Sequence, residues 1–171
     1  MNIAQIPTEL KEFKEWLKGR KIENILEIGV FEGGTVLAWR EVFPEAYILG
    51  IDIGIGTDEL RELAKKNRIE LMLTTDSHDY KTLEKIKDKS FDFLFIDGDH
   101  SYAGVKKDFK MYSPLVKKGG IVVFHDIKDT QRHRDINCFV ADFWKEIKVE
   151  YEHKTIVDES VGWGGIGILY V

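Results

Sequence analysis

The sequence predicts an α/β domain built on a doubly wound, mostly parallel sheet with helices on both faces. Short apolar runs of strand length alternate along the chain with longer segments of helical spacing, which is the order of a β-α-β fold. Several of these runs end in glycine or aspartate, as strands do at the ligand edge of such a sheet. The chain has 171 residues and shows no repeat or linker, so we expect one domain over residues 1–171.

Apolar runs bounded by turn residues predict the buried strands. In chain order they are Asn24–Ile28, Tyr47–Ile51, Ile69–Leu73, Phe91–Ile96 and Ile121–Asp126. The stretch Lys117–Gly120 (K-K-G-G) is expected to be the turn before the last of these strands. Two further runs, Val149–Thr155 and Gly165–Val171, are expected to pair as an antiparallel edge of the sheet.

Segments of helical spacing lie between the strands. They are Gly34–Phe43, Thr57–Asn67, Tyr80–Lys87, Tyr102–Tyr112 and Ile136–Ile147. Residues 1–20 add a helix from about Thr8 to Lys18, whose apolar side chains share one face, so we expect it to pack on the sheet. Pro44 ends one helix, and Thr57 is expected to cap the start of the next.

The stretch Asn24–Thr35 runs from a strand through a glycine turn into a helix. This is the ligand end of a parallel α/β unit, because the helix N-terminus offers free N–H groups and glycine lets a ligand approach the main chain. A dinucleotide fingerprint would need a glycine two residues after Gly29, but Phe31 stands there and its ring would block a pyrophosphate. The loop therefore argues against a nicotinamide-dependent oxidoreductase.

The spacing E-x-G-x-x-x-G, formed by Glu27, Gly29 and Gly33, resembles motif I of the class I S-adenosylmethionine-dependent methyltransferases. In that family the loop wraps the methionine end of the cofactor. The resemblance implies a Rossmann-like sheet of seven strands, with the last one antiparallel. It also implies that S-adenosylmethionine is held by Glu27, Gly29, Val30, Phe31, Gly33, Thr35, Asp52, Ile53, Asp76, Ser77 and Asp97.

Two acidic positions in this set admit a second explanation. Asp52 lies about 20 residues beyond the glycine loop, at the tip of a strand, where a carboxylate meets ribose hydroxyls in nucleoside-binding folds. It could instead accept hydrogen bonds from backbone N–H groups in the turn before Gly54. Asp76 and Ser77 follow the next strand, where the resembled family contacts adenine, but either residue could instead cap the following helix.

Acidic and imidazole side chains gather at the carboxyl ends of two predicted central strands. Asp97 and His100 follow one strand, and His125 and Asp126 end the next. Bringing carboxylates together is costly unless a cation or a protonated partner neutralises them. Oxygen ligands from Asp97 and Asp126 suit Mg²⁺, and ligation by His125 would favour Mn²⁺, Fe²⁺ or Zn²⁺.

The runs F-I-D-G-D-H-S-Y and G-G-I-V-V-F-H-D-I resemble small-molecule O-methyltransferases of the macrocin and mycinamicin, cephalosporin-biosynthesis and catechol types. The resemblance implies that Asp97 and Asp126 bind a divalent cation and that His100 is the general base. His125 departs from the family, because it stands where a Glu or Asp is usual. The departure weakens the charge argument for Mg²⁺ and leaves a metal-free site open.

Composition narrows the classes of partner. A net charge of −5 argues against a nucleic-acid binder, and no apolar run is long enough for a membrane span. The single cysteine, Cys138, excludes an internal disulfide framework and fits a reducing, cytoplasmic setting. Arg132, His133 and Arg134 could grip an anionic substrate or form a solvated loop, and Trp163 could line the acceptor pocket or anchor a turn.

These observations predict a methyltransferase that acts on a small-molecule hydroxyl, with S-adenosylmethionine and a divalent cation as cofactors. An amine acceptor would use the same base, so N-methylation stays open. The alternative from another class is a domain that binds S-adenosylmethionine or S-adenosylhomocysteine without turnover. The acceptor site is expected to be open, or covered by a lid from a second copy in a homodimer.

Overall fold

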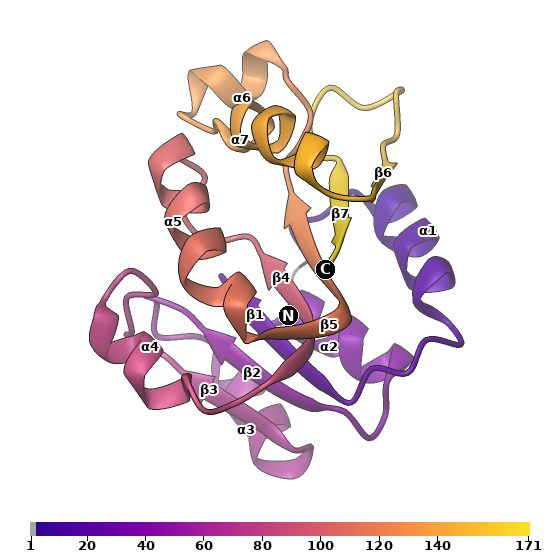
Figure 1. The fold of residues 1–171 in the computed structure, drawn as a ribbon. Coiled ribbons are helices and arrows are strands. Elements are labelled where there is room, and N and C mark those ends of the chain that lie inside the picture. Colours follow the sequence, from indigo (N-terminus) through magenta and orange to yellow (C-terminus); the bar gives the residue numbers. More distant parts are fainter. Residues whose placement is uncertain (1–2) are drawn as a thin grey trace.

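The computed structural model describes residues 3–171 (Figure 1). Within these residues seven strands form one sheet in the order β3-β2-β1-β4-β5-β7-β6. The strands are β1 (Asn24–Ile28), β2 (Tyr47–Ile51), β3 (Ile69–Met72), β4 (Phe91–Ile96), β5 (Val116–His125), β6 (His153–Ile156) and β7 (Ile166–Tyr170). Strands β1 to β5 pair in parallel, whereas β7 runs antiparallel to both β5 and β6. The predicted doubly wound sheet with an antiparallel last strand is confirmed.

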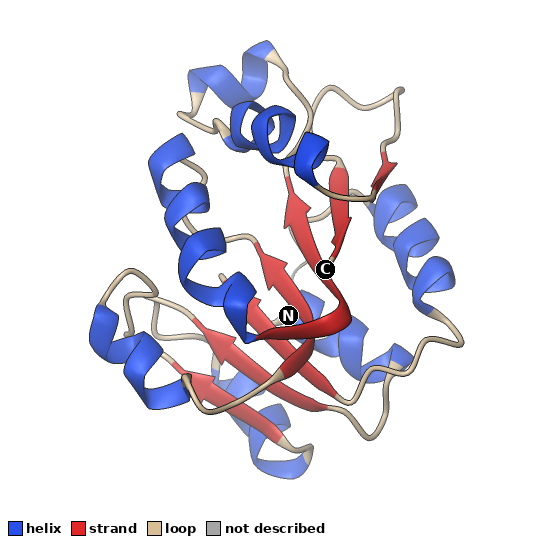
Figure 2. Ribbon diagram, in the orientation of Figure 1, coloured by secondary structure: helices blue, strands red, loops and turns tan. Residues whose placement is uncertain are grey.

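Helices cover both faces of the sheet (Figure 2). They are α1 (Pro7–Leu17), α2 (Gly34–Val42), α3 (Asp58–Lys66), α4 (Tyr80–Ile86), α5 (Tyr102–Tyr112), α6 (Gln131–Asp135) and α7 (Val140–Ile147), with 3-10 turns at Ser113–Leu115 and Lys148–Glu150. One apolar core joins α1, α2 and α3 to the sheet through Phe13, Trp39 and Leu60. A second core joins α4, α5 and α7 to the opposite face. The central strands are buried on both faces, which explains their continuous apolar runs.

The strand order determines where the ligand crevice lies. Strand β1 lies between β2 and β4, so the chain winds first to one side of β1 and then to the other. In open α/β sheets the loops at the carboxyl ends of the strands separate at this switch point and leave a crevice. The glycine loop after β1 and the Asp97 loop after β4 therefore lie side by side, and Asp97 N–H donates to the carbonyl oxygen of Ile28.

Strand β5 begins earlier than the sequence predicts. Lys117–Gly120 is part of the strand, not a turn before it. Val116 pairs with Phe91, whereas Ile121 pairs with Phe93, so the extra residues form an irregularity between these two pairs. Gly119, with φ of +85°, adopts the left-handed backbone that such a bulge requires.

The segment predicted as one helix, Ile136–Ile147, begins at Val140 as α7. A separate short helix, α6, precedes it because the Thr130 hydroxyl accepts a hydrogen bond from the N–H of His133 and caps a helix start there. Asn137, with φ of +61°, separates the two helices. The strand predicted at Val149–Thr155 is shorter as β6, because the 3-10 turn at Lys148–Glu150 takes up its first residues.

No helix within residues 3–171 has the length and apolar character needed to cross a membrane. Residues 1–2 of the predicted domain lie outside the described residues. The organisation of the chain as one domain stays a prediction.

Candidate active site

A cavity of about 680 Å³ opens at the carboxyl ends of the parallel strands. The loops after β1, β2, β3, β4 and β5 all contribute to its wall. Gln5, which precedes α1, and Trp163, from the loop between β6 and β7, complete the wall. The predicted glycine loop and the predicted acidic cluster thus face the same space.

The glycine loop forms one side of the cavity. Gly29 has φ of +86°, and a Cβ atom placed on it would lie 2.1 Å from the backbone oxygen of Asp97. No side chain fits there, so glycine is required for the loops after β1 and β4 to pack together. Val30, Phe31 and Thr35 also line the cavity, and the Phe31 side chain is largely exposed. Gly33 instead lies behind the loop, against the side chain of Leu60.

Glu27 lies outside this lining and is fully buried beneath the loop. Its carboxylate accepts hydrogen bonds from the Thr35 hydroxyl and, at 2.6 Å, from Nε1 of Trp39. Burial raises the pKa of Glu27 to about 8. The structure therefore places this predicted cofactor ligand in a position to fix the start of α2.

Asp52 holds the loops after β1 and β2 together. Its Oδ2 accepts hydrogen bonds from the N–H groups of Val30 and Phe31, each at 2.7 Å, and its Oδ1 accepts one from Gly54 at 2.6 Å. The carboxylate also lines the cavity beside the exposed side chain of Ile53. Asp52 therefore accepts hydrogen bonds from backbone N–H groups, as one of its two predicted roles requires. Its side chain is also accessible to a ligand.

Asp76 and Ser77 line the cavity on the same side as Ile53. Oδ1 of Asp76 accepts a hydrogen bond from the N–H of His78 at 2.7 Å, so Asp76 organises its own turn. The cap of α4 is Asp79, which accepts from Lys81 N–H. Neither Asp76 nor Ser77 caps α4, and both line the cavity.

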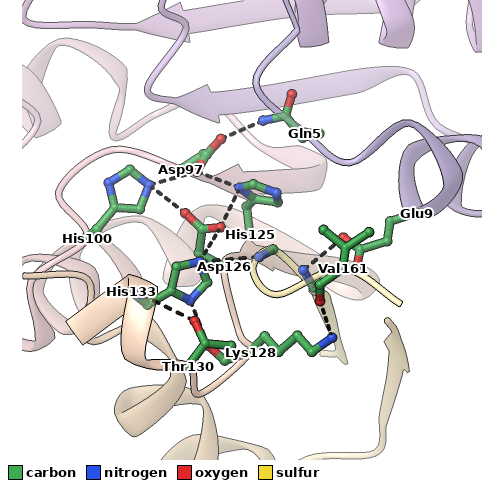
Figure 3. A network of polar contacts seen from close by, with 12 residues as sticks. Gln5, Glu9, Asp97, His100, His125, Asp126, Lys128, Thr130, His133 and Val161 are labelled. Atoms are coloured by element: carbon green, nitrogen blue, oxygen red, sulfur yellow. Dashed lines mark hydrogen bonds and ion pairs between the residues drawn. The ribbon is translucent and has the colours of Figure 1, made fainter. Parts of the chain in front are cut away.

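The other side of the cavity holds a compact cluster of carboxylates and imidazoles (Figure 3). Oδ1 of Asp97 lies 3.0 Å from Nε2 of His100 and 3.2 Å from Nδ1 of His125. Nε2 of His100 also lies 3.3 Å from Oδ2 of Asp126. All four residues predicted for catalysis or metal binding are therefore brought together.

Charge in this cluster is balanced between acids and imidazoles. Burial by itself would raise the pKa of Asp97, but the charge of His125 and hydrogen bonds from both histidines lower it to about 2. Burial would lower the pKa of His125, and Asp97 and Asp126 instead raise it to about 9. The hydrogen bond to Asp97 raises the pKa of His100. The carboxylates and imidazoles therefore stabilise each other's charged forms.

The cluster also fits a divalent cation. One ligand atom each from Asp97, His100 and Asp126 can be chosen so that all lie within 4.8 Å of one another. Oδ1 of Asp126 is buried, and within residues 3–171 it accepts no hydrogen bond. Carboxylate oxygens of this kind would hold Mg²⁺ or Mn²⁺ with cavity water completing the shell.

Gln5 and Cys138 also belong to this cluster, although the sequence does not predict them there. His133 belongs to it as well, and not to a solvated loop. Nε2 of Gln5 donates a hydrogen bond to Oδ2 of Asp97 at 2.7 Å, although 92 positions separate the two residues. No local pattern marks this glutamine. Cys138 lies close enough to Asp126 to share a ligand. The sequence predicts that His133, with Arg132 and Arg134, either binds an anionic substrate or lies in a solvated loop. In the structure His133 is buried, with Nε2 3.3 Å from Oδ1 of Asp126.

Trp163 lines the cavity, which agrees with the first of its two predicted roles, as part of a pocket wall. Its ring meets that of His125 edge to face, with the centroids 6.3 Å apart. The Arg132 guanidinium lies 4.9 Å from the centre of the same ring. Arg134 instead pairs with Asp129, so the three basic or imidazole residues 132–134 do not act on one ligand together.

Comparison with known proteins identifies the family. The model of a methyltransferase domain matches residues 26–127, which run from β1 through the end of β5. An uncharacterised protein of Acanthamoeba polyphaga mimivirus is 34% identical over 68% of this chain. The mycinamicin VI 2''-O-methyltransferase of Micromonospora griseorubida is 31% identical over 61% of this chain. The chain spans 59% and 27% of the lengths of these two relatives.

A solved structure extends the likeness to nearly the whole chain. The MycE methyltransferase of the mycinamycin biosynthetic pathway, in complex with Mg and SAH, superposes with a TM-score of 0.64 and 21% identity. The alignment covers 94% of this chain and 46% of that one. The likeness of sheet and helices, together with the match over residues 26–127, shows that this chain belongs to the methyltransferase-domain family, with the fold of the class I S-adenosylmethionine-dependent O-methyltransferases.

Proposed function

We propose that this chain transfers the methyl group of S-adenosylmethionine to a hydroxyl of a small molecule, with a divalent cation held by Asp97 and Asp126. The observation that carries the proposal is one cavity with a nucleoside-type loop on one side and an acid–imidazole cluster on the other. A domain that only binds the cofactor has no need of the second side. Relatives named as O-methyltransferases support the same activity.

The cofactor would occupy the side of the cavity formed by the loops after β1, β2 and β3. Asp52 is accessible for the ribose hydroxyls, and Asp76 and Ser77 for the adenine edge. The Phe31 side chain lines the cavity at the position where dinucleotide binding requires a glycine, and the cofactor could pack against it. The methionine end would then lie against Gly29 and point toward Asp97.

The acceptor would occupy the other side, against His100, Asp126 and Trp163. Its oxygen attacks the methyl carbon as the carbon–sulfur bond breaks, which releases S-adenosylhomocysteine, and His100 takes the hydroxyl proton. A divalent cation at Asp97 and Asp126 would lower the pKa of the acceptor hydroxyl. Alignment of two bound reactants supplies about 7–11 kcal/mol, the larger share of the acceleration.

The state of His100 agrees with a role for the cation. The hydrogen bond to Asp97 raises the pKa of His100, and the nearby charge of Asp126 acts in the same direction. A cation held by the two carboxylates would offset this attraction and favour the neutral imidazole that a general base needs. The Mg found with the MycE structure supports placing a cation in this fold.

The first test is calorimetric titration of the purified protein with S-adenosylhomocysteine and with NAD. We expect the first to bind and the second not to bind. NAD binding without S-adenosylhomocysteine binding would contradict the proposal and favour an oxidoreductase.

The second test measures release of S-adenosylhomocysteine in the presence of Mg²⁺ and a panel of sugar, phenol and catechol acceptors. His100→Gln and Asp97→Asn should each lower turnover by about 100-fold or more, and His100→Gln should keep cofactor affinity. His153→Gln, at an exposed histidine on β6, is the matched control and should keep full turnover. Cofactor binding with no turnover on any hydroxyl or amine acceptor would instead indicate a binding-only domain.

A further inference from the structure

A second group of ligating side chains lies beneath the acid–imidazole cluster. Asp126, His133 and Cys138 can each offer one ligand atom so that all three atoms lie within 4.8 Å of one another. All three residues are more than nine-tenths buried. His133 and Cys138 have no part in the proposed methyl transfer, so this group needs a separate explanation.

The hydrogen bonds of His133 fix its tautomer. Nδ1 lies 2.7 Å from the carbonyl oxygen of Lys128, which can only accept, so Nδ1 carries the proton. Nε2 accepts from the N–H of Gly164 at 3.2 Å and is therefore unprotonated. A backbone carbonyl on one ring nitrogen is the arrangement that orients a metal-binding histidine through the other.

Nε2 lies close to an acceptor as well as to the N–H of Gly164. Oδ1 of Asp126 lies 3.3 Å away and is buried. Nδ1 of His125 lies 3.4 Å from the same oxygen, but among the described residues none gives it a hydrogen bond (Figure 3). Nε2 and Oδ1 are both acceptors in this tautomer and no hydrogen lies between them, so the contact is unfavourable. A cation placed against both atoms would make the contact favourable, displacing the long bond from Gly164.

Cys138 supplies the third donor and determines which cation fits. The backbone N–H of Val140 contacts its sulfur and offsets only part of the effect of burial on the thiol pKa. Burial raises the pKa of the free thiol to about 11, so Cys138 is inert as a nucleophile unless a cation deprotonates it. One oxygen, one imidazole nitrogen and one sulfur are the ligand set of Zn²⁺, not of Mg²⁺.

The size of the cluster is compatible with zinc after a small adjustment. Zn–N and Zn–S bonds of about 2.0–2.3 Å put the ligand atoms of a tetrahedral site roughly 3.3–3.8 Å apart. The three ligand atoms lie within 4.8 Å of one another, so the group would have to tighten by at most about 1–1.5 Å. The cavity gives access, because Asp126 lies on its wall.

We propose that Asp126, His133 and Cys138 form a zinc site separate from the candidate magnesium site, with Asp126 bridging the two. Oδ1 of Asp126 faces His133, and its Oδ2 faces His100. Zinc at the inner site would hold the carboxylate in the orientation that the outer site needs. The site does not depend on methyl transfer, and its test uses neither cofactor nor acceptor.

The test is titration of the metal-free protein with Co²⁺ as a spectroscopic substitute for Zn²⁺. A thiolate ligand gives a thiolate-to-Co²⁺ charge-transfer band, and Cys138 is the only cysteine of the chain, so the band has one source. We expect the band in the wild type and in Asp97→Asn, which removes an outer ligand only. Cys138→Ser should abolish it, and His133→Gln should weaken Co²⁺ affinity by at least about tenfold.

A second measurement protects the test against variants that do not fold. Zn²⁺ should raise the Tm of the wild type by more than that of Cys138→Ser, which keeps the outer site, with circular dichroism as the check of folding. Absence of the charge-transfer band in folded wild-type protein would overturn the proposal, whatever the variants do. An equally strong band and affinity in His133→Gln would also overturn it.

Discussion

The buried carboxyl group of Glu27 makes the stability of the fold depend on pH. It lies beneath the glycine loop, where it accepts hydrogen bonds from Thr35 and Trp39. Burial raises its pKa from 4.5 to about 8, so the folded state holds this proton more tightly than the unfolded state does. Its stabilising contribution is therefore complete below pH 4.5 and is lost as the pH rises through 8.

The size of the effect follows from the shift. At about 1.4 kcal/mol per pKa unit, a rise from 4.5 to about 8 corresponds to about 5 kcal/mol, of which about 4 kcal/mol falls between pH 5 and pH 9. Glu27→Gln removes the titration and keeps both partners, because its carbonyl oxygen can accept from Trp39 and its amide can donate to the Thr35 hydroxyl. The free energy of unfolding of the wild type should fall by about 4 kcal/mol relative to the variant over this range.

Urea unfolding of both proteins at pH 5, 7 and 9 measures this difference, since all other titrating groups are shared. Glu12→Gln, at an exposed glutamate of α1, is the control and should track the wild type at every pH. A gap between wild type and Glu27→Gln that stays constant from pH 5 to pH 9 would refute the reasoning. Because Glu27 lies outside the cavity lining, the variant should also bind S-adenosylhomocysteine as the wild type does.

Three further substitutions test the loops and the core. Gly29→Ala should unfold at a lower temperature than Gly19→Ala and lose cofactor binding in calorimetry, because both positions have positive φ but only a Cβ at 29 strikes backbone, at Asp97. Asp52→Asn replaces a carboxylate that accepts three backbone hydrogen bonds with an amide that has only one acceptor oxygen. Urea unfolding should show a fall of about 2 kcal/mol in the free energy of unfolding, and S-adenosylhomocysteine should bind more weakly. Phe93→Ala empties a fully buried position and should cost about 3–5 kcal/mol in the same assay without a change in cofactor affinity.

The strands were predictable because their pattern is local. Asn24–Ile28, Tyr47–Ile51 and Phe91–Ile96 match the structure residue for residue, since strands covered by helices on both faces must be apolar along their length. The failure at Lys117–Gly120 is not local in origin. The segment has the composition of a turn, but strand pairs with β4 on either side of it and hydrogen bonds to Val171 at the end of the chain keep it in the sheet as a bulge.

The candidate site was predictable only where strand order determines it. Asp97 and Asp126 follow neighbouring parallel strands, so their meeting follows from the topology. Gln5 and Cys138 reach the same cluster from the N-terminal segment and from the turn before α7. Only tertiary packing brings these segments together, and a lone glutamine or cysteine carries no sign of it in one sequence.

The backbone at Asp126 connects the fold to the chemistry. Its φ of +61° is a left-handed conformation that costs most residues about 1–2 kcal/mol and that aspartate tolerates better than most. The conformation lets the chain leave β5 with one carboxylate oxygen toward His100 and the other toward His133. A left-handed backbone at the residue shared by both candidate cation sites agrees with the proposal that this residue orients ligands for them.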